Sequence, residues 1–267
     1  VTWLERELQP GRATLERWTG RPRILDIDDA IWLHPSSEEG FSLKIAANCD
    51  GLVVGNRFLA DHFAALSVPI WIVPTAVDTD RWRPAEHPDA DEFVIGWTGL
   101  ASNLPNLDPI EPALAAFLEG EPRAVFQIVS EREPDFPRID PSRVRWIRWS
   151  PDSEAEAVSA MDVGLMPVPD TDWSRGKCAF KIVQYMAAGV PVIASPIGMN
   201  AEILEAAEVG IGAREPRDWA AALSRLSADP GLRHRLGAQG RRLALDVYSR
   251  DKVASSLAAI FKQIAAS

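Results

Sequence analysis

The chain has 267 residues, of which 46% are hydrophobic and 25% charged, and its formal net charge is −10. This composition is typical of a soluble globular protein, and no apolar run reaches the roughly 18 to 20 residues of a membrane span. The acidic balance argues against nucleic acid as a partner, because phosphate binding requires clustered lysines and arginines. The opening residues lack the layout of a signal peptide, so we expect a cytoplasmic protein.

Short runs of β-branched and aromatic residues alternate with helical patterns along the chain. This alternation predicts an α/β protein with two Rossmann-like domains built on parallel sheets. The predicted strands are Arg23 to Asp26, Leu52 to Val54, Ile70 to Val73, Phe93 to Trp97, Val125 to Val129, Val144 to Trp149, Val163 to Val168 and Val190 to Ala194. Three helices are expected at the end of the chain, over Pro216 to Leu226, Gly231 to Leu243 and Arg250 to Ala265.

The segment Thr79 to Asp91 breaks the periodicity and predicts an interdomain linker, with the boundary near Pro84 to Asp91. We expect a partial N-terminal domain over residues 1–88, a C-terminal domain over 89–248, and a last helix over 249–267 that returns to the N-terminal domain. About 85 residues with roughly three strands are few for an independent α/β domain. The first residue is not Met and the opening resembles helical sequence, so the N-terminal domain is expected to be truncated.

Three aspartates, Asp26, Asp28 and Asp29, follow the first predicted strand, and strand alternation sends Asp26 and Asp28 to the same side. Such a cluster could hold a divalent cation or supply the nucleophile of a phosphohydrolase. The continuation Asp29-Ala30 does not fit the hydrolase pattern, so a hydrolase is the less favoured alternative. Asp28 and Asp29 are otherwise candidates for contacting an acceptor, and Asp29 equally for capping the following helix.

Ligands of open parallel sheets bind beyond the carboxyl ends of the strands, where helix N-termini point N–H groups at anions. The loop after Phe93 to Trp97 offers Gly99, Ser102 and Asn103 as a tight turn with a helix cap, although a plain strand–helix turn would look the same. The loop after Val190 to Ala194 offers Gly198, Met199 and Asn200, which also fit a plain capped helix.

The loop after Val163 to Val168 carries positive charge into a helix expected to begin near Lys177. Lys177, Lys181 and Gln184 would then fall on one face, with Arg175 close by. Two ammonium groups beside a helix N-terminus predict a diphosphate site, against the alternative of a solvated lysine face. Among the aromatic residues near strand ends, Trp173 is the best candidate to flank a ligand.

The stretch Asp162 to Leu204 resembles the donor-binding core of retaining GT-B glycosyltransferases, particularly the bacterial family 4 group. Ile70 to Pro84 resembles the crossover into the donor domain, Phe93 to Asn103 resembles its first strand and loop, and the resemblance covers roughly Arg21 to Phe261. It implies that Lys181 and Gln184 meet the phosphates and ribose of a nucleotide-sugar donor and that Gly198 to Ala201 lies near the sugar.

The chain also departs from the pattern of that family. Many members carry a Glu-x7-Glu pair where this sequence has Gly176 and Gln184. Many also place a basic residue in the first donor loop, where this chain has Thr98, Leu100 and Ser102. The phosphate charge is therefore expected to fall on Lys177, Lys181 and Arg175.

The resemblance implies a glycosyltransferase that moves a sugar from a nucleotide-sugar to an acceptor with retention of configuration. The nucleotide-sugar would be a substrate, so no cofactor is expected, and the lysines would serve in catalysis without a metal. The acceptor is left open among a glycan, a lipid-linked molecule and a small molecule, and peripheral association with a membrane is compatible with this function. A catalytically silent nucleotide-sugar-binding module remains an alternative.

Overall fold

The computed structural model describes residues 1–85 and 91–266, so part of the expected boundary at Pro84 to Asp91 lies outside the described residues. The chain divides into two compact units. Unit 1 contains Val1–Ala76, Asp170–Cys178 and the C-terminal segment from Arg250, and unit 2 contains Val77–Pro169 and Ala179–Ser249. The division thus falls earlier than residue 88, and the first unit takes a short segment from the middle of the chain.

Unit 1 is built on a four-stranded parallel sheet with the order β1-β2-β3-β4. The strands are β1 (Thr2–Glu5), β2 (Arg23–Ile27), β3 (Gly51–Val54) and β4 (Ile70–Ile72). The sequence predicted the last three but not β1, and the expectation of helical sequence at the start was wrong. Four residues are too few to show an alternating pattern of their own, and β1 is defined by its pairing with β2, from Thr2↔Arg23 to Glu5↔Asp26.

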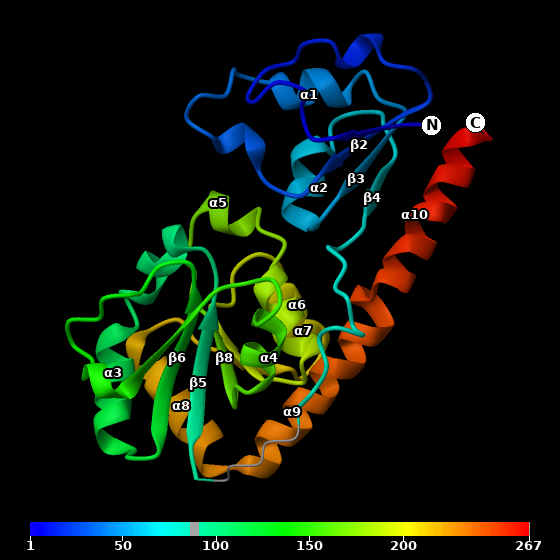
Figure 1. Cartoon of the computed structure of the whole chain (residues 1–267). Helices are drawn as coiled ribbons and strands as arrows, with labels where there is room; N and C mark the ends of the chain where they lie inside the picture. Colours follow the sequence, from blue (N-terminus) through cyan, green and yellow to red (C-terminus); the bar gives the residue numbers. More distant parts are fainter. Residues whose placement is uncertain (86–90, 267) are drawn as a thin grey trace. The chain divides into compact units, whose positions relative to one another are not determined.

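Unit 1 is covered by helices α1 (Phe41–Ala46), α2 (Arg57–Phe63) and α10 (Arg250–Ala265), with short 3-10 helices η1 (Glu16–Trp18) and η2 (Ile31–Leu33). Because right-handed crossovers between strands in sequential order all lie on one side of a sheet, the connections between β1 and β4 leave the other side open. Helix α10 covers that side, where Val253, Ile260 and Ile264 pack with Ile24, Val53 and Val73 (Figure 1). The last helix is therefore part of the core of unit 1.

Unit 2 is built on a six-stranded sheet with the order β10-β9-β8-β5-β6-β7, and every pairing in it is parallel. The strands are β5 (Phe93–Thr98), β6 (Ala124–Ser130), β7 (Val144–Arg148), β8 (Val163–Met166), β9 (Val192–Ala194) and β10 (Gly210–Gly212). The sequence did not predict β10, which is short and glycine-rich. The strand order reverses between β5 and β8, and such a reversal is where open α/β sheets bind ligands.

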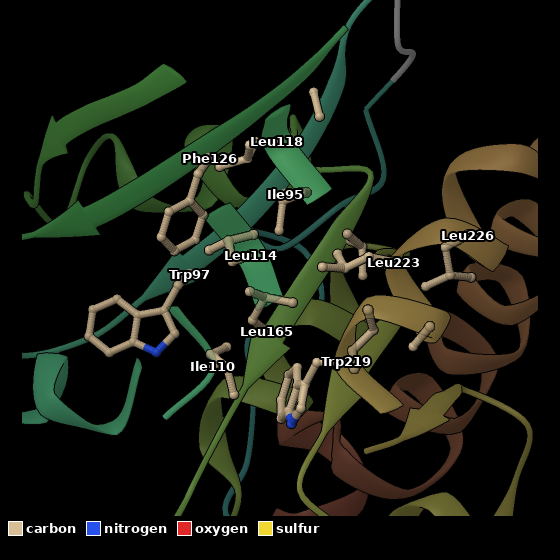
Figure 2. Packing of buried hydrophobic residues seen from close by; sticks show 14 of the residues in the cluster. Ile95, Trp97, Ile110, Leu114, Leu118, Phe126, Leu165, Trp219, Leu223 and Leu226 are labelled. Atoms are coloured by element: carbon tan, nitrogen blue, oxygen red, sulfur yellow. The ribbon is translucent and has the colours of Figure 1, made fainter. Parts of the chain in front are cut away.

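The helices of unit 2 cover both faces of this sheet. They are α3 (Glu111–Gly120), α4 (Glu154–Ser159), α6 (Phe180–Ala187), α7 (Met199–Ala206), α8 (Pro216–Ala228) and α9 (Pro230–Leu243), with 3-10 helices η3 (Ala101–Leu107) and η4 (Pro141–Arg143) and a π-helical turn η5 (Ala244–Tyr248). Figure 2 shows one of these faces, where Leu114 and Leu118 of α3 and Trp219 and Leu223 of α8 pack with the strands. Within the described residues, no helix is long and apolar enough to cross a membrane.

Candidate functional site

Strands β5 and β8 separate at the carboxyl edge of the sheet in unit 2, because they pair only at Ile95↔Val163 and Gly96↔Gly164. The buried hydroxyl of Tyr185 fills the opening: it accepts a hydrogen bond from Thr98 N at 3.1 Å and donates to Leu165 O at 3.3 Å. Burial raises the pKa of this hydroxyl well above its ordinary value, so it stays protonated. Tyr185 therefore holds the two strands at the topological switch point.

Sequence reasoning did not single out Tyr185. The sequence signal that could have indicated this contact is Gly164, since a glycine inside a strand marks a close approach of another group to the backbone. A Cβ atom at Gly164 would lie 2.6 Å from the Tyr185 ring, so the ring rests directly on the strand. This packing fixes α6 against β8.

Lys181 is the second residue of α6 and lies at this same edge. Its Nζ is 5.6 Å from the centroid of the Trp97 ring, and a Cβ atom at Gly99 would lie 2.5 Å from its Cε. A side chain at residue 99 would force the lysine stem or the buried Trp97 ring to shift, and Gly99 leaves room for both. The arrangement places a half-buried ammonium beside the carboxyl end of β5 and the N-terminus of α6.

The predicted helical face of Lys177, Lys181 and Gln184 is wrong, because α6 begins at Phe180 and not near Lys177. Ala179 has φ of 49°, a left-handed conformation that a right-handed helix does not continue through. Lys177 belongs to unit 1 and Lys181 to unit 2. Gln184 is on α6 but is buried, with 5% of its surface exposed.

The sequence predicted that Ser102 or Asn103 caps the helix after β5, and the structure shows that neither does. Both residues lie inside η3, whose N-cap is Leu100 without a side-chain hydrogen bond. The N–H of Ala101 is instead bound by the Glu131 carboxylate, and this hydrogen bond holds the pKa of Glu131 below its ordinary value. The cap therefore comes from the loop after β6.

The loop after β9 leads into α7 through Gly198, which has φ of 53°. Met199 and Asn200 follow it and are both buried. Asn200 is not a cap: its Nδ2 donates to Ser195 O at 3.1 Å, and Ser195 Oγ accepts from Val168 N at 3.1 Å. These bonds tie the loops after β8 and β9 together at the switch-point edge.

Unit 1 carries the acidic cluster. Asp26 and Asp28 line one pocket of about 210 Å³ together with Arg6, whose Nε is 3.8 Å from Asp28 Oδ1. Asp29 does not cap the following helix, because the N-cap of η2 is Ala30 and has no side-chain hydrogen bond. The Asp29 carboxylate instead accepts from Lys177 Nζ at 2.9 Å.

The other basic residue predicted for the donor, Arg175, also lies in unit 1. Its guanidinium donates to Asp170 Oδ1 at 2.8 and 3.0 Å, and this contact raises the pKa of Arg175. Trp173 is 40% exposed, with Lys177 Nζ 4.4 Å from the centroid of its ring. Across the described parts of the chain, histidine, cysteine, aspartate and glutamate form no group of three or more that could hold a metal ion.

Burial, and then the neighbouring charges of Asp28 and Glu5, raise the pKa of Asp26 to about 7. A carboxyl group whose pKa is higher in the folded protein than in the unfolded chain lowers the free energy of unfolding as the pH rises. For Asp26 this decrease runs from about pH 4, where the group ionises in the unfolded chain, to about pH 7. Asp26→Asn should therefore stabilise the protein by an amount that grows across this range and reaches about 1 to 2 kcal/mol above pH 7, since solvent in the pocket screens part of the effect.

Urea unfolding between pH 4 and 8 would measure this difference, with the exposed Asp61→Asn as a control for the loss of one charge. If the stability difference between Asp26→Asn and the unmodified protein does not change with pH, the raised pKa of Asp26 is not its cause.

The two parallel sheets place the chain among the open α/β proteins, whose ligands bind beyond the carboxyl ends of the strands at the switch point of the sheet. A family model described as "Glycosyl transferases group 1" matches residues 92–229, more than half of the chain. The chain therefore belongs to the group 1 glycosyl transferases.

Two curated relatives are D-inositol 3-phosphate glycosyltransferases. The protein from Actinosynnema mirum is 27% identical over 251 residues, covering 82% of this chain and 59% of the relative. The protein from Rhodococcus jostii is 24% identical over 249 residues, covering 82% of this chain and 54% of the relative. The chain thus spans little more than half the length of these relatives.

Solved structures establish the fold. Sucrose-phosphate synthase from Thermosynechococcus elongatus superposes with a TM-score of 0.73 at 17% identity, over 95% of this chain and 70% of that one. Anabaena HepE, solved in complex with UDP, superposes with a TM-score of 0.71 at 17% identity, over 91% of this chain and 72% of that one. The chain has the GT-B fold, as the sequence predicted.

Proposed function

We propose that the protein transfers a sugar from a nucleotide-sugar donor and that unit 2 binds the donor. The observation that carries the proposal is Lys181, held at the switch point by Gly99 and Trp97. Membership of the group 1 glycosyl transferases supports it. Anabaena HepE, which shares the fold, has been solved with UDP and with UDP-glucose, so a uridine diphosphate sugar is the first donor to test.

In this proposal the donor diphosphate lies at the N-terminus of α6, where the Lys181 ammonium and the helix dipole oppose its charge. Negative charge grows on the leaving nucleoside diphosphate as the glycosidic bond breaks, and a fixed cation there lowers the barrier. The lysine would fill this role without a metal. Retention of the anomeric configuration is proposed from the resemblance to retaining enzymes, as are donor contacts by Gly198, Met199 and Asn200.

Unit 1 would hold the acceptor, with Asp28 orienting the attacking hydroxyl group. Asp29 is already bound by Lys177, so in this proposal the ion pair forms part of the wall of the acceptor site. The acceptor class stays open among glycans, lipid-linked molecules and small molecules.

Lys181→Ala should weaken UDP binding by about 1.5 to 3 kcal/mol, the scale of a hydrogen bond to a charged group, or roughly 10-fold to 150-fold in Kd. Titration calorimetry of the full chain with UDP would measure the loss. Uridine should bind almost unchanged, since the ammonium is assigned to phosphate oxygens.

Lys262→Ala is a matched control, because Lys262 is an exposed lysine near the end of α10 in unit 1. If Lys181→Ala and the unmodified protein bind UDP equally well, the donor site is not at the start of α6.

A catalytically silent donor-binding module is the second candidate, and Gly176 favours it. The resemblance implies a glutamate facing the sugar at this position, but a Cβ atom on Gly176 would lie only 2.6 Å from Ala30 Cβ. A larger residue does not fit there without a shift of the backbone. Mass-spectrometric detection of UDP released from UDP-glucose, with or without an added acceptor, would exclude the silent module.

A further inference from the structure

Glu154 brings a carboxylate to the switch-point edge of unit 2. It is the first residue of α4, and its Oε1 accepts a hydrogen bond from the Thr98 hydroxyl at 3.1 Å. Thr98 is the last residue of β5, and only 1% of its surface is exposed. The carboxylate is therefore anchored at the carboxyl end of β5, beside the point where the strand order reverses.

The anchor uses only one of the two carboxylate oxygens. Glu154 is half-buried, and its Oε2 is not enclosed and has no hydrogen-bond partner within the described residues. An ionised carboxylate only accepts hydrogen bonds, and its two oxygens together have room for about four donors. Glu154 can therefore accept hydrogen bonds from a ligand while Thr98 holds it in place.

The same strand end also holds Lys181. Gly99 follows Thr98 directly, and a Cβ atom at Gly99 would lie 2.5 Å from Lys181 Cε. Burial contributes most to the raised pKa of the nearby Tyr185 hydroxyl, and the charge of Glu154 adds to that effect. Since consecutive Cα atoms are only about 3.8 Å apart, the carboxylate and the ammonium group are held by neighbouring residues of one strand end.

A nucleoside diphosphate carries the two groups that this pair can recognise. Its ribose has a 2′,3′-diol, which offers two hydroxyl donors, and is joined directly to the α-phosphate. The diphosphate suits the ammonium group and the diol suits a carboxylate, as in dinucleotide-binding α/β proteins, where an acidic residue binds the ribose hydroxyl. The resemblance implies that Gln184 meets the ribose, but its amide is neutral and only 5% of its surface is exposed.

We propose that Glu154 accepts hydrogen bonds from the ribose diol of the donor and so selects nucleotides with an intact ribose. The assignment rests on the proposed function, in which the Lys181 ammonium binds the diphosphate of the same donor. A carboxylate this close to a diphosphate repels it unless the diol lies between them and donates to the carboxylate. Glu154 therefore disfavours nucleotides that lack the hydroxyl groups or carry a phosphate on them.

Titration calorimetry of the full chain with UDP and with 2′,3′-dideoxyuridine diphosphate tests this assignment without requiring turnover. Glu154→Gln keeps an oxygen that accepts from Thr98 but removes the charge. It should raise the Kd of UDP about 10-fold, the effect of losing a hydrogen bond to a charged group, and leave the Kd of the dideoxy nucleotide unchanged or lower. Glu156→Gln is the matched control, because Glu156 is an exposed glutamate in the same turn of α4, and both Kd values should stay unchanged.

The sign of the change separates a ribose contact from a purely structural role. If Glu154→Gln binds UDP equally well or more tightly, the ribose assignment is overturned while UDP binding still supports the donor site. Equal weakening of UDP and the dideoxy nucleotide would also overturn it, because the substitution would then act through the position of β5.

Every nucleoside diphosphate carries the same ribose, so GDP, ADP and CDP with their dideoxy analogues replace UDP if UDP does not bind. If the unmodified protein binds none of the four nucleoside diphosphates, the donor proposal itself fails and the ribose assignment falls with it.

Discussion

Trp219→Ala should lower the free energy of unfolding of unit 2 by about 3 to 5 kcal/mol, the usual cost of removing a buried tryptophan. Trp219 lies on α8 with only 2% of its surface exposed, in the same buried cluster as Leu165 of β8 (Figure 2). Ile193 of β9 belongs to this cluster as well. Truncation leaves a large cavity between α8 and the central strands. These strands also carry the switch-point loops, so the same substitution should weaken UDP binding.

Native-state hydrogen exchange of β5 and β8 amides would report the stability of unit 2 separately from that of unit 1. Trp149→Ala is the control, since Trp149 is in the same unit but 41% exposed, and it should change the stability by less than about 1 kcal/mol. Similar losses for the two variants would show that Trp219 does not anchor this core.

Gly237→Ala should destabilise unit 2 by about 3 kcal/mol, the upper end of the usual cost of overpacking. At an exposed helix position the same change stabilises by up to about 1 kcal/mol, because alanine is the better helix former. Gly237, on α9, is buried, and a Cβ atom there would lie 2.0 Å from the carbonyl oxygen of Gly189. That neighbour is backbone in a turn with φ of 71°, so it cannot rotate away as a side chain would.

Gly120→Ala is the matched control, because Gly120 ends α3 and a Cβ atom there would have no neighbour within 4 Å. It should be neutral or stabilising in the same exchange experiment. If Gly237→Ala also stabilises, the close approach of α9 to the turn after α6 does not persist in solution.

The sequence predicted most strands within a few residues because buried parallel strands are dense in β-branched and aromatic side chains, as in Phe93–Thr98 and Ala124–Ser130. It failed for β1 and β10, which contain four and three residues. Pairing with β2 and β9, distant in the sequence, defines these strands, and a local pattern cannot show it.

The site was predicted less well than the fold. The helix after β8 and the position of Lys181 on it agree with the structure, while the role of Lys181 in donor binding stays a prediction. The start of that helix was wrong because it depends on one left-handed residue, Ala179, which a local pattern does not reveal. The helix-cap assignment for Ser102 was wrong because this residue lies inside η3. Those for Asn200 and Asp29 were wrong because their side chains are bound to Ser195 O and to Lys177 Nζ instead.

The chain passes from one unit to the other four times, at Ala76–Val77, Pro169–Asp170, Cys178–Ala179 and Ser249–Arg250. Two of these passages bracket the segment with Trp173 and Lys177, and Lys181 follows only a few residues later. A rotation of one unit against the other would have to change the backbone dihedral angles at all four passages at once. The two units are therefore restrained more strongly than two domains that are joined by a single linker.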